Sequence, residues 1–175
     1  VLKVASVIGD AFNVAMLQKA VAEQPHAGAM GESIRRLIEN DFLISQERGG
    51  AGATYAFRHS LSQEAIYNLL SFAQRRTLHR QIATLIEESQ SDELQLFFAQ
   101  LARHWEQAEE PIQAVRYLEL AAEQALHNYG NRDSVRYLDR IFELTEQAGF
   151  TIDPGRLIGW EIMLGDAYHE LSEYD

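Results

Sequence analysis

The residues best suited to chemistry stand together in the segment "YAFRHSLSQEAIYNLL", Tyr55–Leu70. Arg58 offers a guanidinium that pairs with phosphate or carboxylate, and His59 offers an imidazole whose charge changes near neutral pH. The pair stands where a run of β-forming residues gives way to a helical pattern. Such a pair can be incidental at the surface, can cap the helix, or can act as a sensor. His59 can also bridge strand and helix through a bond to a backbone carbonyl. All of these interpretations stay open.

A second basic cluster consists of Arg75, Arg76, His79 and Arg80. Residues three or four apart share a helix face, so the spacing predicts a basic strip. The strip is unusual because Lys and Arg total 15 against 26 Asp and Glu, a net charge of -11. We expect it either to dock an acidic surface or a phosphate, or to be solvated and neutralised by neighbouring glutamates.

Composition disfavours several other kinds of site. The chain has no cysteine, and its six histidines lack the spacing of metal ligands, so we expect no metal. There is no Gly-x-x-x-x-Gly-Lys-Ser/Thr loop and no distinct catalytic triad or carboxylate pair, so we expect no cofactor and no enzyme activity in this chain. The acidic charge argues against nucleic acid as a partner. With no long apolar run, we expect no membrane span and a cytoplasmic location.

The first part of the chain changes its periodicity once. Helical spacing predicts three helices: one ended by Gly9, one closing before Pro25, and one over about Gly31–Asn40. The short runs "FLISQE" and "TYAFRH" then predict a β-hairpin, and we interpret "GGAG", Gly49–Gly52, as its turn rather than a phosphate loop. Three helices followed by a hairpin is the order of a winged helix.

From Ser60 onward the pattern is helical almost to the end. Ser60 and Gln63 have the spacing of a capping box. Four later helices are expected over about 93–107, 111–128, 132–147 and 156–172. The buried stripe of the helix after Ser60 is predicted to contain Leu61, Ala65, Ile66 and Leu69.

The later helices carry a weak repeat. "LARHW", Leu101–Trp105, and "LGDAY", Leu164–Tyr168, share a pattern typical of tetratricopeptide helices, and Ala114, Leu118 and Ala121 suit the partner helix. We therefore predict a mainly α chain, a winged helix with one β-hairpin followed by antiparallel helical hairpins. The expected divisions are a winged-helix domain over 1–72, connecting helices over 73–94, and tetratricopeptide-like repeats over 95–175, truncated at the end.

Four motifs in order resemble one family over nearly the whole chain: "LKVASVIGDAF", "YAFRHSLSQEAIYNLL", "RRTLHRQIA" and "LARHWEQAEEPIQAVRYLELAAEQA". They are similar to the winged-helix and tetratricopeptide-like region of STAND-type signalling ATPases, including those fused to class III adenylate or guanylate cyclases and to protein kinases. The resemblance implies that ATPase and output domains lie outside this chain, which we interpret as a fragment, and that ATP or ADP binds in the longer protein.

The resemblance also suggests a role for the Arg58–His59 pair. "FRHSL", Phe57–Leu61, is similar to the Met-His-Asp-Leu motif of plant immune receptors and apoptotic ATPases, where the histidine reaches bound ADP. Carried over, His59 donates to a phosphate oxygen of ADP and Arg58 pairs with phosphate or an acidic group. Phe57 and Ser60 depart from the motif by standing where it has Met and Asp.

The expected function is therefore a non-catalytic regulatory and interaction segment that couples nucleotide state to output. Its expected partners are the ATPase and output domains of the same protein and a protein or peptide on the repeats. The alternative is a winged-helix DNA-binding regulator, in which "SIRRLIENDFL" with Arg35 and Arg36 is the recognition helix. We also expect the terminal helix to leave an apolar face uncovered.

Overall fold

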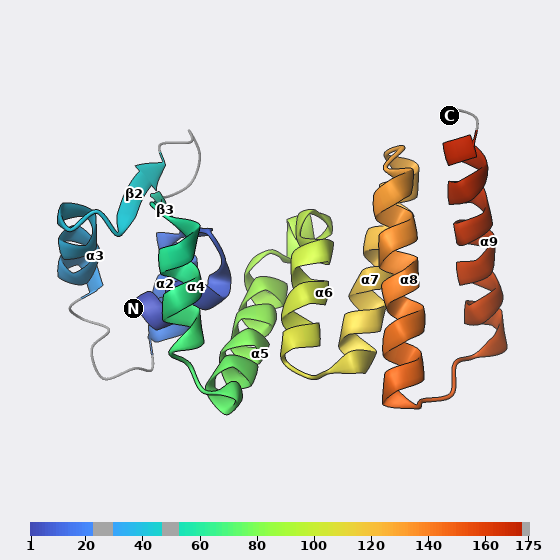
Figure 1. The fold of residues 1–175 in the computed structure, drawn as a ribbon, viewed down its shortest axis with the longest axis horizontal. Helices are drawn as coiled ribbons and strands as arrows, with labels where there is room; N and C mark the ends of the chain where they lie inside the picture. Colours follow the sequence, from blue (N-terminus) through green and yellow to red (C-terminus); the bar gives the residue numbers. More distant parts are fainter. Residues whose placement is uncertain (23–29, 47–52, 173–175) are drawn as a thin grey trace. The chain divides into compact units, whose positions relative to one another are not determined.

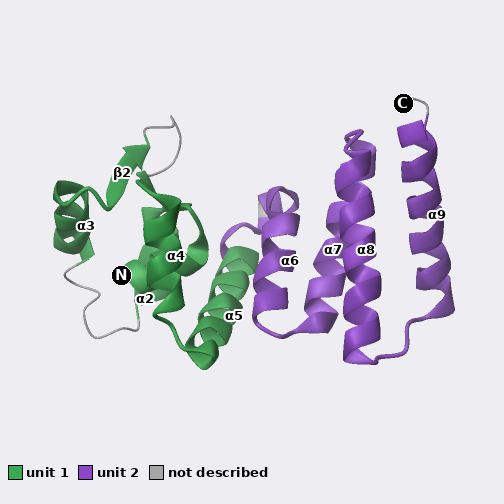
Figure 2. Ribbon diagram, viewed as in Figure 1, with its two compact units in different colours: residues 1–88 green, residues 89–175 purple. Residues whose placement is uncertain are grey.

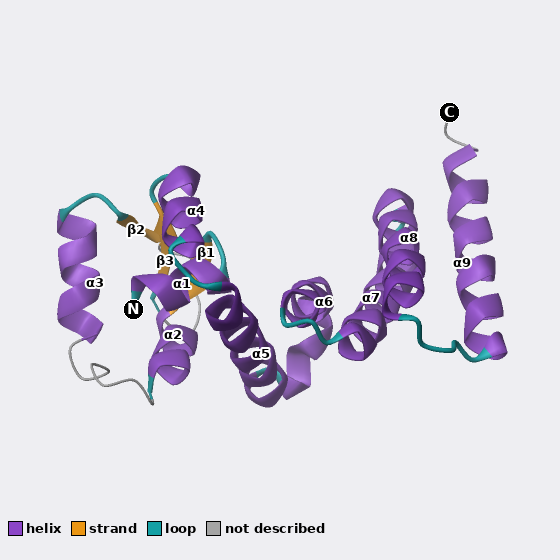
Figure 3. Cartoon of the chain, turned by 60° about the horizontal axis from the view of Figure 1, so that its bottom comes forward, coloured by secondary structure: helices purple, strands orange, loops and turns teal. Residues whose placement is uncertain are grey.

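The computed structural model describes residues 1–22, 30–46 and 53–172 (Figure 1). The chain divides into two compact units, Val1–Glu88 and Ser89–Asp175 (Figure 2). Most described residues are helical, and strands occur only in unit 1 within the described part (Figure 3). The prediction of a mainly α chain with an antiparallel hairpin is confirmed.

Unit 1 alternates short helices with three short strands before two further helices. In chain order its elements are α1 (Leu2–Ile8), β1 (Ala11–Asn13), α2 (Val14–Val21), α3 (Met30–Glu39), β2 (Leu43–Gln46), β3 (Thr54–Phe57), α4 (Ser60–Asn68) and α5 (Phe72–Ser89). The helices before the hairpin begin and end close to where helical spacing predicts them.

The sheet has the strand order β1-β3-β2, and both pairs are antiparallel. β2 and β3 form the predicted hairpin, in the register that pairs Leu43 with Phe57. The proposed turn at Gly49–Gly52 lies outside the described residues.

The strand β1 is absent from the sequence-based prediction, which has one hairpin and no third strand. β1 pairs Phe12 with Tyr55 of β3, and the Phe12 side chain is buried. Its ring lies edge-on to Phe57 with centroids 6.1 Å apart. Three residues are too few to display the alternation by which a strand is recognised in a sequence. Its pairing partner lies more than forty residues away, where local periodicity carries no information about it.

Gly9 makes the reversal between α1 and β1 possible. The residue has φ 149° and ψ -169°, a conformation that L side chains rarely adopt. β1 then begins two residues later. Apolar side chains from helices and strands together form the core of this unit, among them Val4, Val7, Phe12, Leu17, Ile34 and Leu43.

The helix α4 differs most from its prediction. Leu61 is 75% exposed and Leu69 70% exposed, so the predicted buried stripe is wrong at both leucines. No residue of α4 is buried, although the helix contacts α1 and β3. The side of α4 that faces the rest of unit 1 contains Gln63 and Ile66, which are half-buried. This side is rotated by more than a quarter of a turn about the helix axis from the side that carries Leu61 and Leu69.

The predicted capping box is also wrong. His59 occupies the N-cap position and its side chain makes no capping bond, while Ser60 is already the first helical residue. The Gln63 side chain does not reach back to the cap. Its Nε2 donates to the backbone oxygen of Ser6 at 2.6 Å, which joins α4 to α1. A long-range partner has therefore replaced the local one.

Unit 2 is built of consecutive helices, each packed on the next. They are η2 (Ser91–Phe97, a 3-10 helix), α6 (Phe98–Gln107), α7 (Pro111–His127), α8 (Asn131–Ala148) and α9 (Pro154–Ser172). Contacts join α6 to α7, α7 to α8 and α8 to α9, and neighbours run in opposite directions (Figure 1). Unit 2 therefore contains the predicted antiparallel helical hairpins.

Two boundaries differ from the expected ones. The helix expected from residue 93 begins as α-helix only at Phe98, because Glu93 has non-helical φ -126° and ψ 24° inside η2. The boundary between the two units, after Glu88, falls inside the segment expected as connecting helices over 73–94. That segment contains most of α5 and the start of η2.

The two copies of the repeat motif pack differently. Leu101, Ala102 and Trp105 are buried, as the pattern predicts, and so are Ala114, Leu118 and Ala121 on α7. In the second copy Gly165 has open space around it and Tyr168 is 52% exposed, so neither mediates close helix packing.

The last described helix is fixed to its neighbours by a buried tryptophan. Trp160 is fully buried, and its Nε1–H donates to Glu119 of α7 at 2.8 Å. Arg156 donates to the other oxygen of the same carboxylate at 2.7 Å, and Phe142 of α8 meets the indole edge-on. The opposite side of α9 exposes more than half of Ile158 and Ile162, as expected for an uncovered apolar face.

Candidate functional site

The Arg58–His59 pair lies at the predicted junction, between the end of β3 and the start of α4. The backbone of this junction is well bonded. The Arg58 N–H donates to the Phe42 carbonyl at 3.0 Å, and the His59 carbonyl accepts from the N–H of Ser62 at 3.0 Å. Strand pairing on one side and the first helical turn on the other therefore fix where both side chains emerge.

The His59 side chain is exposed and makes no hydrogen bond within the described part of the chain. The backbone-carbonyl contact expected under the structural interpretation is therefore not formed there. An exposed imidazole at a helix N-cap is free to meet an acceptor supplied from outside this chain.

Arg58 already has a partner. Its Nη1 donates to Asp41 Oδ1 at 2.7 Å, and the two side chains are 47% and 74% exposed. Solvent-exposed ion pairs contribute little to stability, about 0–1 kcal/mol. A competing phosphate or carboxylate can therefore displace Asp41 at small cost.

The second predicted cluster separates into two pairs. His79 is only 2% exposed, and its Nε2 lies 3.0 Å from the Tyr67 hydroxyl of α4. Arg75 stacks over the same tyrosine ring, 4.5 Å from its centroid, and donates to the Leu70 carbonyl and the Asn68 side chain. His79 and Arg75 thus fix α5 to α4 and do not belong to an exposed docking strip.

Helix geometry explains this division. Arg75 and His79 are four residues apart and share the face of α5 that meets α4, whereas Arg76 and Arg80 lie one residue further around. Arg76 is half-buried and Arg80 is exposed. Of the four residues that the sequence predicts as one strip, His79 is buried, Arg75 is half-buried and committed to α4, and Arg76 and Arg80 lie on the neighbouring face of α5.

The arginines of α3 are paired within their own helix. Arg35 and Arg36 both donate to the Glu32 carboxylate, at 3.1 and 3.0 Å. One carboxylate thus offsets part of the charge of the only two strong cations on this helix. This arrangement weakens α3 as a helix for reading DNA.

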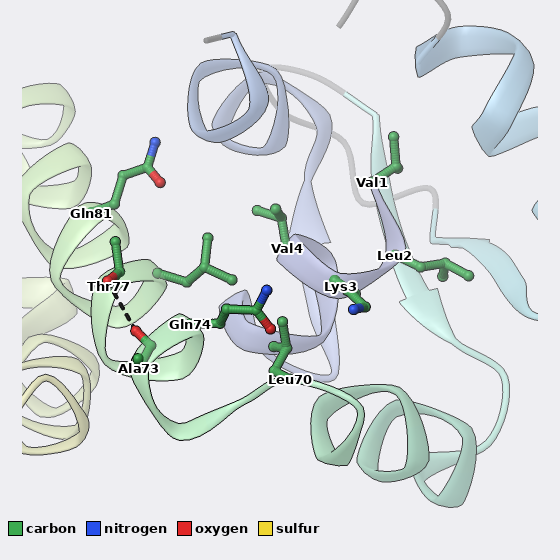
Figure 4. A pocket seen from close by; sticks show the side chains of 10 residues that line it. Val1, Leu2, Lys3, Val4, Leu70, Ala73, Gln74, Thr77 and Gln81 are labelled. Atoms are coloured by element: carbon green, nitrogen blue, oxygen red, sulfur yellow. Dashed lines mark hydrogen bonds between the residues drawn. The ribbon is translucent and has the colours of Figure 1, made fainter. Parts of the chain in front are cut away.

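A pocket of about 760 Å³ lies in unit 1 between α1 and the first turns of α5. Figure 4 shows Lys3 and Val4 of α1 on one side and Gln74, Thr77 and Gln81 of α5 on the other. The side chains that line it include one cation, Lys3, and neither a carboxylate nor a histidine. These side chains offer hydrogen bonds but no acid–base pair for catalysis.

A groove of about 550 Å³ in unit 2 was not predicted from the sequence. Four arginines line it: Arg103 of α6 and Arg132, Arg136 and Arg140 of α8. The signal was available, because residues 132, 136 and 140 recur every fourth position in "NRDSVRYLDR" and must share a helix face. We name this feature the arginine groove.

A network of partly exposed ion pairs anchors the arginine groove. Glu106 Oε1 accepts from Arg140 Nε at 3.1 Å and Nη2 at 2.6 Å, and Arg140 Nη1 also donates to Glu143. The hydrogen bonds that Arg140 donates to Glu106 and, to a smaller extent, to Glu143 raise the pKa of Arg140 above its ordinary value. Arg140 therefore stays charged and holds α8 to α6.

Two kinds of feature are absent from the described residues. The side chains resolved in the structure include no group of His, Cys, Asp or Glu able to hold a metal ion. Among the helices described, none is long and apolar enough to cross a membrane.

Comparison with known proteins gives one distant relative. The chain is 27% identical over 147 residues to an uncharacterized protein, R02095, of Rhizobium meliloti (strain 1021). The similar region covers 84% of this chain and 14% of that relative, so the chain spans about one seventh of the relative's length. No protein-family model matches the chain, and no solved structure matches it.

Proposed function

We propose that the chain is a non-catalytic regulatory and protein-interaction segment of a longer ATPase-linked signalling protein. In this proposal a winged helix precedes tetratricopeptide-like hairpins, and the segment couples the nucleotide state of an ATPase module to an adenylate or guanylate cyclase or kinase output domain. The longer protein binds ATP or ADP, and this chain supplies residues that respond to it.

The order of elements in unit 1 supports the winged-helix part. Helix α1, strand β1, helices α2 and α3, and the hairpin β2–β3 follow one another as they do in winged helices, with β3 at the centre of the sheet. The paired helices of unit 2 suit tetratricopeptide-like hairpins. The much greater length of the Rhizobium meliloti relative fits a segment of a multidomain protein.

The observation that carries the proposal is the exposed apolar face of α4. Leu61, Ala65 and Leu69 follow one another at four-residue spacing, and all three are exposed. Phe72, the first residue of α5, is 67% exposed and continues the apolar surface along the chain. Exposed apolar clusters of this kind mark interaction surfaces. His59 stands at the N-cap of the same helix, where a docked ATPase module would bring nucleotide to it.

A test of this coupling uses His59→Ala in the longer protein. A charge-assisted hydrogen bond contributes about 1.5–3 kcal/mol, so its loss is expected to speed ADP release roughly tenfold or more and to raise basal output. Arg58→Ala acts in the same direction but less strongly, because Asp41 already competes for that guanidinium.

The matched control is His127→Ala, another exposed histidine, near the end of α7. Neither substitution is expected to change the melting temperature of the 175-residue chain, because both imidazoles are exposed. Unchanged ADP release with a large fall in the melting temperature of His59→Ala would show that His59 is structural.

A further inference from the structure

We propose that the arginine groove binds an acidic segment of polypeptide in which carboxylate side chains alternate with other residues. This inference names the chemistry of the partner that binds the helical hairpins. It rests on the function proposed above only for its biological setting. The binding itself is a property of unit 2 and needs no ATPase module.

The spacing of the arginines sets the spacing of the ligand. Arg132, Arg136 and Arg140 are successive members of one α8 face, and residues four apart rise by about 6 Å along a helix. Side chains on one face of an extended peptide recur every second residue, at about 6.6 Å. Alternate carboxylates of an extended peptide therefore match the backbone spacing of Arg132 and Arg136, the two members of the row that Glu106 and Glu143 do not hold, whereas consecutive carboxylates point to opposite sides.

The charges of the arginine groove favour an acidic ligand despite the acidic chain. Four arginines line it against three carboxylates, while the whole chain carries a net charge of -11. Two of those carboxylates, Glu106 and Glu143, are committed to Arg140. The lining thus carries a small excess of positive charge within an acidic chain, which favours an anionic ligand there.

Two guanidinium groups are available at the rim. Arg132 is exposed and makes no ion pair within the described ranges. Arg136 pairs with Asp133 at 3.0 Å, but with side chains 69% and 59% exposed, and such pairs exchange readily for a better acceptor. Guanidinium groups bind carboxylates through two parallel hydrogen bonds, which gives orientation as well as affinity.

The remaining lining suits a polypeptide rather than a nucleic acid. Ala99 is exposed and Val135 and Tyr137 are half-buried, and these side chains offer apolar contacts to the hydrocarbon parts of a peptide. A nucleic acid strand would bring a continuous row of phosphates toward a chain of net charge -11, and the resulting repulsion grows with every nucleotide. A short peptide presents its charges only where the arginines lie.

The experiment measures fluorescence anisotropy of a labelled octapeptide with glutamate at alternate positions, titrated with the 175-residue chain. The comparison peptide has the same composition with its glutamates consecutive, and a single-stranded oligonucleotide is titrated in parallel. We expect the alternating peptide to bind more tightly than the consecutive one, and more weakly at higher salt.

The decisive variant is the double charge reversal Arg132→Glu with Arg136→Glu. We expect it to weaken peptide binding at least about fivefold, since two exposed pairs are lost and repulsion replaces them. The control is Arg35→Glu with Arg36→Glu on α3, which changes the net charge equally at a site far from this groove in the sequence. Retained melting temperature in both doubles shows that the fold is intact.

Several results overturn the proposal. These are no binding of the alternating peptide, equal weakening by both double variants, and preferential binding of the oligonucleotide. The test also separates this proposal from the preceding one. Peptide binding that fails while His59→Ala still speeds ADP release removes the groove assignment alone, and peptide binding that succeeds while ADP release is unaffected removes only the nucleotide coupling.

Discussion

Tyr67 acts through two different parts of its side chain. The ring accepts the Arg75 guanidinium on its face, and the hydroxyl meets buried His79. A hydrogen bond at a buried imidazole matters more than one at the surface, because water cannot replace a lost partner. The sequence indicates a helical face containing Arg75 and His79, but residue type alone suggests a surface strip. Only the position of a tyrosine on the preceding helix makes that face an internal contact.

Tyr67→Phe isolates the hydroxyl. The ring contact with Arg75 is kept, and the bond to His79 Nε2 is lost, so we expect a loss of about 1–3 kcal/mol in the free energy of unfolding. For a unit of this size the melting temperature should fall by about 4–8 °C per kcal/mol. Tyr129→Phe, at a residue that is 85% exposed, should leave the melting temperature unchanged. An equal effect of the two substitutions in thermal denaturation followed by circular dichroism would contradict the assignment.

Helices were the most predictable elements, and the reasons are local. Pro111 stands at the first turn of α7, and Gly149 adopts the left-handed φ of 65° that closes α8. These signals lie within a few residues of the boundary that they set. The exposed face of α4 could not be predicted in the same way. Periodicity shows that α4 carries an apolar stripe. Whether another segment covers that stripe depends on residues distant in the sequence, so local spacing cannot predict it.

Substitution of two glycines by alanine tests the backbone conformations described for α1 and α9. Gly9→Ala places a side chain at φ 149° and should cost about 1–3 kcal/mol in unit 1. Gly165→Ala lies inside α9 with nothing within 4 Å of the added carbon, and should stabilise unit 2 by about 0.5–1 kcal/mol. Chemical denaturation of both variants measures the two changes. Effects of the same sign would contradict the assigned conformations.

At the scale of the whole molecule, the net charge favours the regulatory segment over the DNA-binding regulator. The winged helix that we propose for unit 1 is a fold used by many DNA-binding proteins, but the net charge of -11 and the pairing of Arg35 and Arg36 with Glu32 oppose contact with phosphates. The fold class thus follows from periodicity, whereas the function depends on which charges are already paired. The arginine groove illustrates the same point, because the four-residue spacing on α8 was visible while its partner Glu106 on α6 was not.

We therefore expect no retardation of mixed-sequence duplex DNA by the 175-residue chain at physiological salt. Weak retardation at low salt that disappears as salt rises is compatible with nonspecific contact. A Kd below about 1 µM at physiological salt would favour the DNA-binding alternative, since nonspecific binding under those conditions is weaker. Gel shifts over a salt series make this measurement.

The strand order of unit 1 has a consequence for solubility. The central strand β3 is paired on both sides, so the outer strands β1 and β2 are the ones that expose unpaired backbone groups. β1 has three residues and β2 has four. Outer strands this short offer few consecutive hydrogen bonds to a strand from another molecule, which is one way that proteins avoid edge-to-edge aggregation. The small size of the sheet thus protects the chain from forming extended β-structure between molecules.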